Sequence, residues 1–138
     1  MEIDEERLRR IDGLKELFER ESAIDEIEID DLVDLLQGNA AFVELLRFTK
    51  GGLTKHLQAF KNDNAETKIR STFKHLMFGK GDYLQRIYDC VFLPEYKLSH
   101  WGQNCTFELF GWINQDGVPP INGRIMKALR YLGLDVPV

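Results

Sequence analysis

Hydrophobic residues recur every three or four positions along most of the chain, which is the spacing of one face of an α-helix. Residues 4–22 show the pattern first, with Leu8, Ile11, Leu14 and Leu17 on one face. The spacing returns in most later segments, and no segment alternates hydrophobic and polar residues as a half-buried strand would. The chain is therefore predicted to be all-α, a compact bundle of about seven short helices joined by short loops.

Polar residues in front of these periodic stretches predict where several helices begin. Asp30, Asn39 and Asp82 each precede such a stretch, where a side-chain oxygen can accept one of the unpaired N–H groups of the first helical turn. Gly38 and the pair at 51–52 follow two of the stretches, as expected of residues that end a helix.

Charge divides the chain into two parts. Residues 1–45 contain 5 Lys/Arg and 15 Asp/Glu, a net charge of −10, whereas residues 46–138 contain 13 Lys/Arg and 8 Asp/Glu, a net charge of +5. With 138 residues the chain has the length of one domain. We interpret 1–37 as an acidic N-terminal helical segment and 39–138 as the basic helical core of that domain. The acidic segment could pack on the domain as a solvated helix, dock a protein partner, or cover the basic core.

Several kinds of chemistry lack their usual sequence signals. Cys90 and Cys105 have no metal-type spacing, and the three histidines form no metal-binding motif, so neither a metal nor another cofactor is expected. The charged opening "MEIDEERLRR" is unlike a secretory signal, and no apolar run approaches the ~18 residues that span a bilayer. We therefore expect a cytoplasmic protein without a membrane partner.

The most informative stretch is residues 98–133, "LSHWGQNCTFELFGWINQDGVPPINGRIMKALRYLG". It predicts a tight turn, a helix over 103–113, a loop stiffened by two prolines, and a second helix that begins near Asn122. On that second helix Ile125, Met126, Leu129 and Leu132 share an inward face, while Arg124, Lys127 and Arg130 fall largely outside it.

This order of elements resembles the helix-hairpin-helix DNA glycosylase superfamily, especially its adenine glycosylase and endonuclease III branches. Trp101 and Gly102 match the hydrophobic residue and the second glycine of the family's hairpin. Asn122, 20 residues further on, falls where the family has its catalytic aspartate. The resemblance covers about 36 of the 138 residues, and it implies a helix-hairpin-helix-like fold for this C-terminal part.

The departures from the family argue against its activity. The first hairpin glycine is replaced by His100, the catalytic aspartate by Asn122, and the lysine of the lyase-capable members by Asn104. A neutral amide can neither stabilise the positive charge that develops on the sugar nor form an imine. The family's iron–sulfur cysteines are also absent from the sequence. We therefore predict a glycosylase-like scaffold with no catalytic residue.

The leading hypothesis is a non-catalytic module that binds nucleic acid through phosphates. Its partner would be DNA, with RNA as a second choice, and the resemblance implies a role in DNA repair or genome defence beside a catalytic partner. The hairpin turn would supply backbone and amide donors, and the later helix would supply charge. The predicted contact residues are Trp101, Gly102, Gln103, Asn104, Asn122, Arg124, Lys127 and Arg130.

The same residues could instead have purely structural roles. Trp101 could fill the core, Asn122 could serve only as a helix N-cap, and the basic residues could form an ordinary solvated face. The alternative function is a helical protein–protein adaptor without affinity for nucleic acid. A third hypothesis is an enzyme with altered chemistry.

Overall fold

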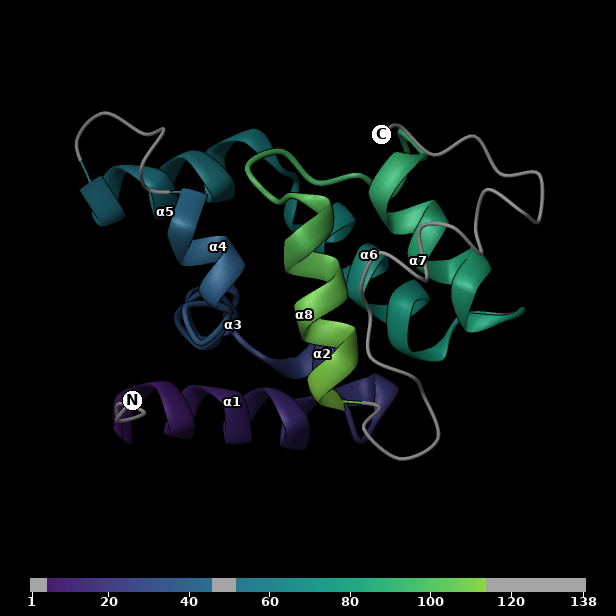
Figure 1. Ribbon diagram of the computed structural model, residues 1–138, viewed down its shortest axis with the longest axis horizontal. Helices are drawn as coiled ribbons and strands as arrows, with labels where there is room; N and C mark the ends of the chain where they lie inside the picture. Colours follow the sequence, from purple (N-terminus) through teal and green to yellow (C-terminus); the bar gives the residue numbers. More distant parts are fainter. Residues whose placement is uncertain (1–4, 46–51, 114–138) are drawn as a thin grey trace.

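The computed structural model describes residues 5–45 and 52–113, with the exception of the side chains of 112 and 113. These residues form eight α-helices and no strand (Figure 1). The helices are α1 (Glu5–Leu17), α2 (Glu21–Glu26), α3 (Ile29–Leu36), α4 (Ala40–Glu44), α5 (Gly52–Asp63), α6 (Glu66–Phe78), α7 (Tyr83–Phe92) and α8 (Gln103–Ile113). The predicted all-α fold is confirmed. The second helix of the predicted helix–loop–helix, near residues 122–132, lies outside the described residues.

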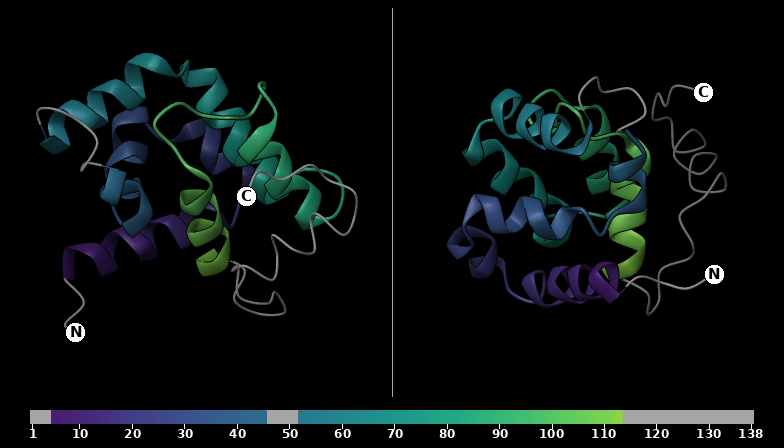
Figure 2. Two further views of the ribbon diagram at one scale, coloured as in Figure 1. Left: turned by 45° about the horizontal axis from the view of Figure 1, so that its top comes forward. Right: turned by 90° about the vertical axis from the view of Figure 1, so that its left-hand side faces the viewer.

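Two groups of helices meet at α4 and α8. Helices α1 to α3 form one half of the molecule and α5 to α7 the other, as the right-hand view of Figure 2 shows. Helix α8 spans both halves and contacts α1, α4 and α7, while α2 packs on α6. The hairpin-like turn before α8 therefore sits on an element that is held from several sides.

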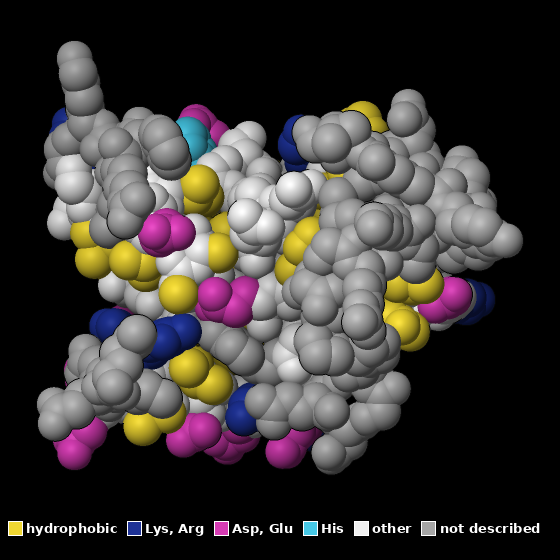
Figure 3. Space-filling model, in the orientation of Figure 1, with side chains coloured by type: hydrophobic (Ala, Val, Ile, Leu, Met, Phe, Trp, Pro, Cys, Tyr) yellow, Lys and Arg dark blue, Asp and Glu magenta, His cyan; other side chains and the backbone are white. Residues whose placement is uncertain are grey.

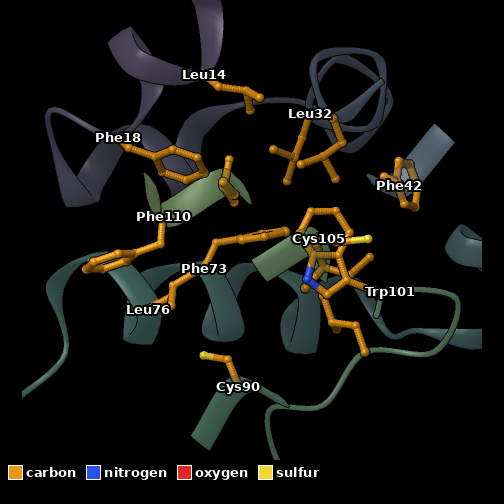
Figure 4. Packing of buried hydrophobic residues seen from close by; sticks show 14 of the residues in the cluster. Leu14, Phe18, Leu32, Phe42, Phe73, Leu76, Cys90, Trp101, Cys105 and Phe110 are labelled. Carbon is orange, nitrogen blue, oxygen red and sulfur yellow. The ribbon is translucent and has the colours of Figure 1, made fainter. Parts of the chain in front are cut away.

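A single hydrophobic core runs through both halves. Trp101 lies at its centre, with ring centroids 5.2 Å from Phe42 and 5.5 Å from Phe73 (Figure 4). The acidic N-terminal segment contributes Leu14 and Leu32 to the same core, both with no exposed surface. Residues 1–37 are thus not an appendage, because their described helices bury apolar side chains against the rest of the domain.

Helix starts agree with the predicted caps in two of three cases. The Asn39 side chain accepts a hydrogen bond from Phe42 N at 3.0 Å, and that of Asp82 accepts one from Leu84 N at 3.0 Å. The prediction for Asp30 is wrong, since α3 begins at Ile29 with Glu28 at the N-cap position. The Asp30 carboxylate instead pairs with Lys61 on α5.

The predicted single helix over 4–22 is divided into α1 and the first residues of α2. Helix α1 packs on α3, whereas α2 packs on α6. One straight helix over residues 4–22 could not make both contacts. Gly13 belongs to the first of these interfaces. A Cβ atom at Gly13 would lie 2.6 Å from Leu35 Cδ2, so the missing side chain lets α1 approach α3 closely. None of the described helices is long and apolar enough to cross a membrane.

Candidate functional site

The candidate site is the turn that leads from α7 into α8. At its apex His100 has a φ of +61°, the only positive φ of a non-glycine residue in the described part of the chain. Such a left-handed conformation is uncommon for a residue with a side chain. The backbone at His100 therefore adopts a conformation that glycine would favour.

The residue before the apex is fixed by a buried asparagine. Asn64, which is 4% exposed and follows α5 directly, donates from Nδ2 to Ser99 O at 2.8 Å. Its Oδ1 accepts from Ser99 N at 2.7 Å, and its Nδ2 also donates to Phe60 O at 2.8 Å. One side chain thus ties the end of α5 to both backbone groups of a residue 35 positions later.

The apex itself is held by a neighbouring carboxylate. His100 Nε2 lies 2.6 Å from Asp63 Oδ2, and both side chains are partly exposed. His56 on α5 lies close to the pair, and its ring centroid is 6.1 Å from that of His100. Burial lowers the pKa of His56, and the nearby His100 lowers it further. The His100 side chain is therefore directed toward α5.

Trp101 anchors the turn in the core. Its side chain is only 6% exposed, and its Nε1 donates to Thr106 Oγ1 at 2.9 Å. The indole is consequently not exposed for contact with a nucleic acid. Of the two predictions for Trp101, a contact residue or a core residue, the structure shows the core residue.

Gly102, Gln103 and Asn104 form the accessible part of the turn. A Cβ atom added to Gly102 would meet nothing within 4 Å, and the two amide side chains are exposed. Gly102 O accepts from Cys105 N at 3.1 Å, so the N–H groups of Gln103 and Asn104 precede the first internal bonds of α8. A cavity of about 340 Å³ adjoins them, lined also by Ala41, Glu44, Leu45 and Cys105.

Helix α4 is bound to α8 through polar contacts that the sequence did not signal. Asn39 Nδ2 donates to Cys105 O at 2.8 Å, and the Glu108 carboxylate accepts from Ala40 N at 2.6 Å and Ala41 N at 3.3 Å. Burial raises the pKa of Glu108, although the two backbone hydrogen bonds act against the shift. The partners are 66 to 68 residues apart, so local pattern could not have revealed them.

Three of the eight Lys and Arg residues described between residues 52 and 113 form ion pairs within the molecule. Lys61 Nζ lies 3.0 Å from Asp30, and Lys74 Nζ lies 2.9 Å from Asp25, so two acids of the N-terminal segment pair with helices α5 and α6. Arg70 Nη1 donates to the Ile24 carbonyl at 2.6 Å. On the face drawn in Figure 3, cationic and anionic side chains are interspersed with apolar ones, and the described residues form no continuous basic strip there.

The remaining predicted contact residues fall in an undescribed part of the chain. Asn122, Arg124, Lys127 and Arg130 lie outside the described residues. Within the described ranges no group of three or more His, Cys, Asp or Glu side chains is placed to hold a metal ion. Burial raises the pKa of both Cys90 and Cys105 to about 12, which leaves two inert thiols.

Comparison with known proteins identifies no relative of this chain. No protein-family model matches the chain, and neither the curated proteins nor the solved structures give a significant match. The likeness of residues 98–133 to helix-hairpin-helix glycosylases therefore stays a prediction made from the sequence.

Proposed function

We propose that the chain is a non-catalytic, helix-hairpin-helix-like module that binds nucleic acid through its phosphates. The observation that carries the proposal is the open turn at Gly102, where the exposed Gln103 and Asn104 precede the first internal hydrogen bond of α8 and follow the left-handed His100. The start of a helix attracts anions because its unpaired N–H groups and its dipole both favour negative charge. A backbone without a side chain at Gly102 lets a phosphate oxygen come close.

The absence of catalysis follows from the residue types. Asn104 is exposed at the helix start, but its amide cannot act as the amine that forms an imine in lyases. Asn122 offers an amide where a carboxylate would be needed. The module would accordingly bring an enzyme to nucleic acid, in DNA repair or genome defence, and that cellular role rests on the resemblance alone.

In the proposal, charge for the contact comes from basic residues of the C-terminal stretch that the sequence predicts to be the later helix. The described cations Lys61, Arg70 and Lys74 already have partners within the molecule. In the proposal Lys127 and Arg130 supplement the neutral donors of the turn. Each phosphate contact made by a cation adds about one unit to the slope of log affinity against log salt.

The experiment is a salt titration of fluorescence anisotropy with the full chain. The probes are short single- and double-stranded DNA and an RNA of the same sequence. Gly102→Val should keep the fold, because a Cβ atom at this position meets nothing within 4 Å, yet should weaken binding at every salt concentration. Lys127→Ala with Arg130→Ala should lower the salt slope by about 2. Absence of binding by the folded wild type at low salt would end the nucleic-acid proposal.

The adaptor function is the second candidate, and the ion pairs favour it. A phosphate-binding surface needs positive charge that is not neutralised by its own protein. Here Lys61, Arg70 and Lys74 are paired within the molecule. A groove of about 330 Å³ combines Arg7 and Arg10 with the apolar Val43 and Leu53. Binding of a protein through such a mixed groove would depend far less on salt than binding of phosphates.

A further inference from the structure

We propose that the outer side of α1 holds a docking groove for a basic amphipathic helix of a partner protein. The groove has a volume of about 600 Å³, and none of its lining residues belongs to the turn before α8. The inference goes beyond the proposed function, because it holds whether or not the chain binds nucleic acid. The lining residues that carry it are the apolar Leu8, Gly13 and Leu35 and the acidic Glu5, Asp12 and Glu16.

The apolar part of the groove lies between α1 and α3. Leu8 on α1 is the most exposed large hydrophobic side chain of the described residues, at 42%. Leu35 on α3 is half-buried beside Gly13, where an added Cβ atom would lie 2.6 Å from Leu35 Cδ2. Because Gly13 has no side chain, α1 leaves a hollow next to Leu8. A partner side chain placed in this hollow would remove exposed apolar surface from water.

The arrangement of these residues along α1 fits a helical partner. One face of α1 carries four of them at steps of three or four positions, namely Glu5, Leu8, Asp12 and Glu16. This stripe runs roughly 16 Å, at about 1.5 Å per residue. A partner helix of about three turns covers that length. The groove between two packed helices accepts a third helix through the same ridge-and-groove packing.

The charge of the groove determines the charge of the partner. Its three carboxylates are exposed and form no ion pair with any described residue. Arg9 is the cation among the described lining residues, and it lies 3.0 Å from Glu6 and 3.4 Å from Asp34, so its charge is already balanced. Acidic and apolar side chains also lie together along the lower edge of the molecule in Figure 3, over α1. The complement of such a surface is a helix with Lys or Arg beside an apolar face.

The test measures binding of a labelled synthetic peptide to the full chain by fluorescence anisotropy. The probe is an amphipathic helix of about 18 residues made of leucine, lysine and alanine, with leucine on one face and lysine beside it. A second peptide has the same composition with its leucines dispersed, so it reports attraction by charge alone. The patterned probe should bind about tenfold more tightly than the dispersed one at low salt.

One pair of variants assigns the apolar contact. Leu8→Ala should weaken binding of the patterned probe about fivefold, because it removes the exposed apolar side chain of the groove. Leu53→Ala is the matched control, since Leu53 is the other exposed large hydrophobic residue among those described and lines a different groove. It should change the affinity less than twofold. Both side chains are exposed, so circular dichroism and thermal melts should show an intact fold.

A second pair of variants assigns the charge. Combining Glu5→Gln, Asp12→Asn and Glu16→Gln should weaken binding about tenfold at low salt and much less at high salt, because salt screens exposed charges. The control also removes three exposed carboxylates, but outside the groove, and should cost less than about threefold. Its substitutions are Glu26→Gln, Glu28→Gln and Glu95→Gln.

Several results would overturn the inference. They are the absence of peptide binding, equal binding of the two peptides, equal effects of the two charge variants, and a loss in Leu53→Ala instead of Leu8→Ala. Sedimentation of the wild type alone adds one more arm. Self-association that Leu8→Ala abolishes would assign the groove to a second copy of this chain and would refute a basic helical partner. Failure of the nucleic-acid proposal is recognised separately, by the absence of DNA binding.

Discussion

Replacement of Asn64 by alanine should destabilise the fold by about 2–5 kcal/mol. The side chain is 4% exposed and makes three hydrogen bonds of 2.7 to 2.8 Å. A buried carbonyl such as Phe60 O costs about 1–3 kcal/mol when its partner is removed. The two backbone groups of Ser99 are partly exposed and can regain water, so we expect about 0.5–1 kcal/mol for each. Their sum gives the predicted loss.

Urea unfolding of the full chain, followed by circular dichroism, measures this loss. Asn62→Ala is the matched control, because Asn62 is an exposed asparagine in the last turn of α5, two residues before Asn64, and its replacement should change stability by no more than about 0.5 kcal/mol. A loss below about 1 kcal/mol for Asn64→Ala, or an equal loss for both variants, would refute the claim that this amide holds the turn.

Three further predictions follow from packing, burial and acidity. Gly13→Ala should change stability by less than about 1 kcal/mol in urea unfolding, since the new Cβ meets only the end of the half-buried Leu35 side chain, which can rotate away, and the gain in helix propensity offsets the cost of that shift. Stability should fall as the pH drops below about 6.5 in thermal melts, because burial lowers the pKa of His56 and the unfolded chain then binds the proton that the fold excludes. Cys90 and Cys105, whose pKa is raised to about 12, should react with a disulfide reagent at pH 8 only after unfolding.

Each of these has a control. In a Leu35→Ala background, where the contact is absent, Gly13→Ala should stabilise the fold by about 0.5–1 kcal/mol through helix propensity, and a loss of stability there would contradict the packing argument. His56→Gln should flatten the loss of stability between pH 7.5 and pH 5.5, and an identical profile would assign the effect to another group. Rapid labelling of either thiol in the native protein would show that the thiol is not buried in solution.

Helices were predictable where one apolar face and a local cap determine them. The bounds of α8 agree with the predicted 103–113, and Asn39 and Asp82 cap their helices through bonds to residues two or three positions away. The break between α1 and α2 was not predictable, because it depends on which distant helix each one packs against. The N-cap prediction for Asp30 also failed because of a distant contact, since the Asp30 carboxylate pairs with Lys61 on α5.

The candidate site was predictable only in part. Pattern located Gly102 and the start of α8, but the interactions that shape the turn come from Asp63 and Asn64, far earlier in the chain. Exposure also cannot be deduced from residue type, which is why Trp101 had two interpretations until its burial was known. The ion pairs of the acidic segment likewise depend on tertiary packing, so the net charge of the basic core overstated its free positive charge.

Chemical-shift mapping tests the central claim most directly. The labelled full chain is titrated with a short single-stranded DNA at low salt, and the backbone amide signals are followed by NMR. The account predicts that the largest shifts occur at Gly102, Gln103 and Asn104, and that Gly102→Val abolishes them while the remaining spectrum stays that of a folded protein. Shifts confined to other residues, or none at all, would contradict a phosphate site at this turn.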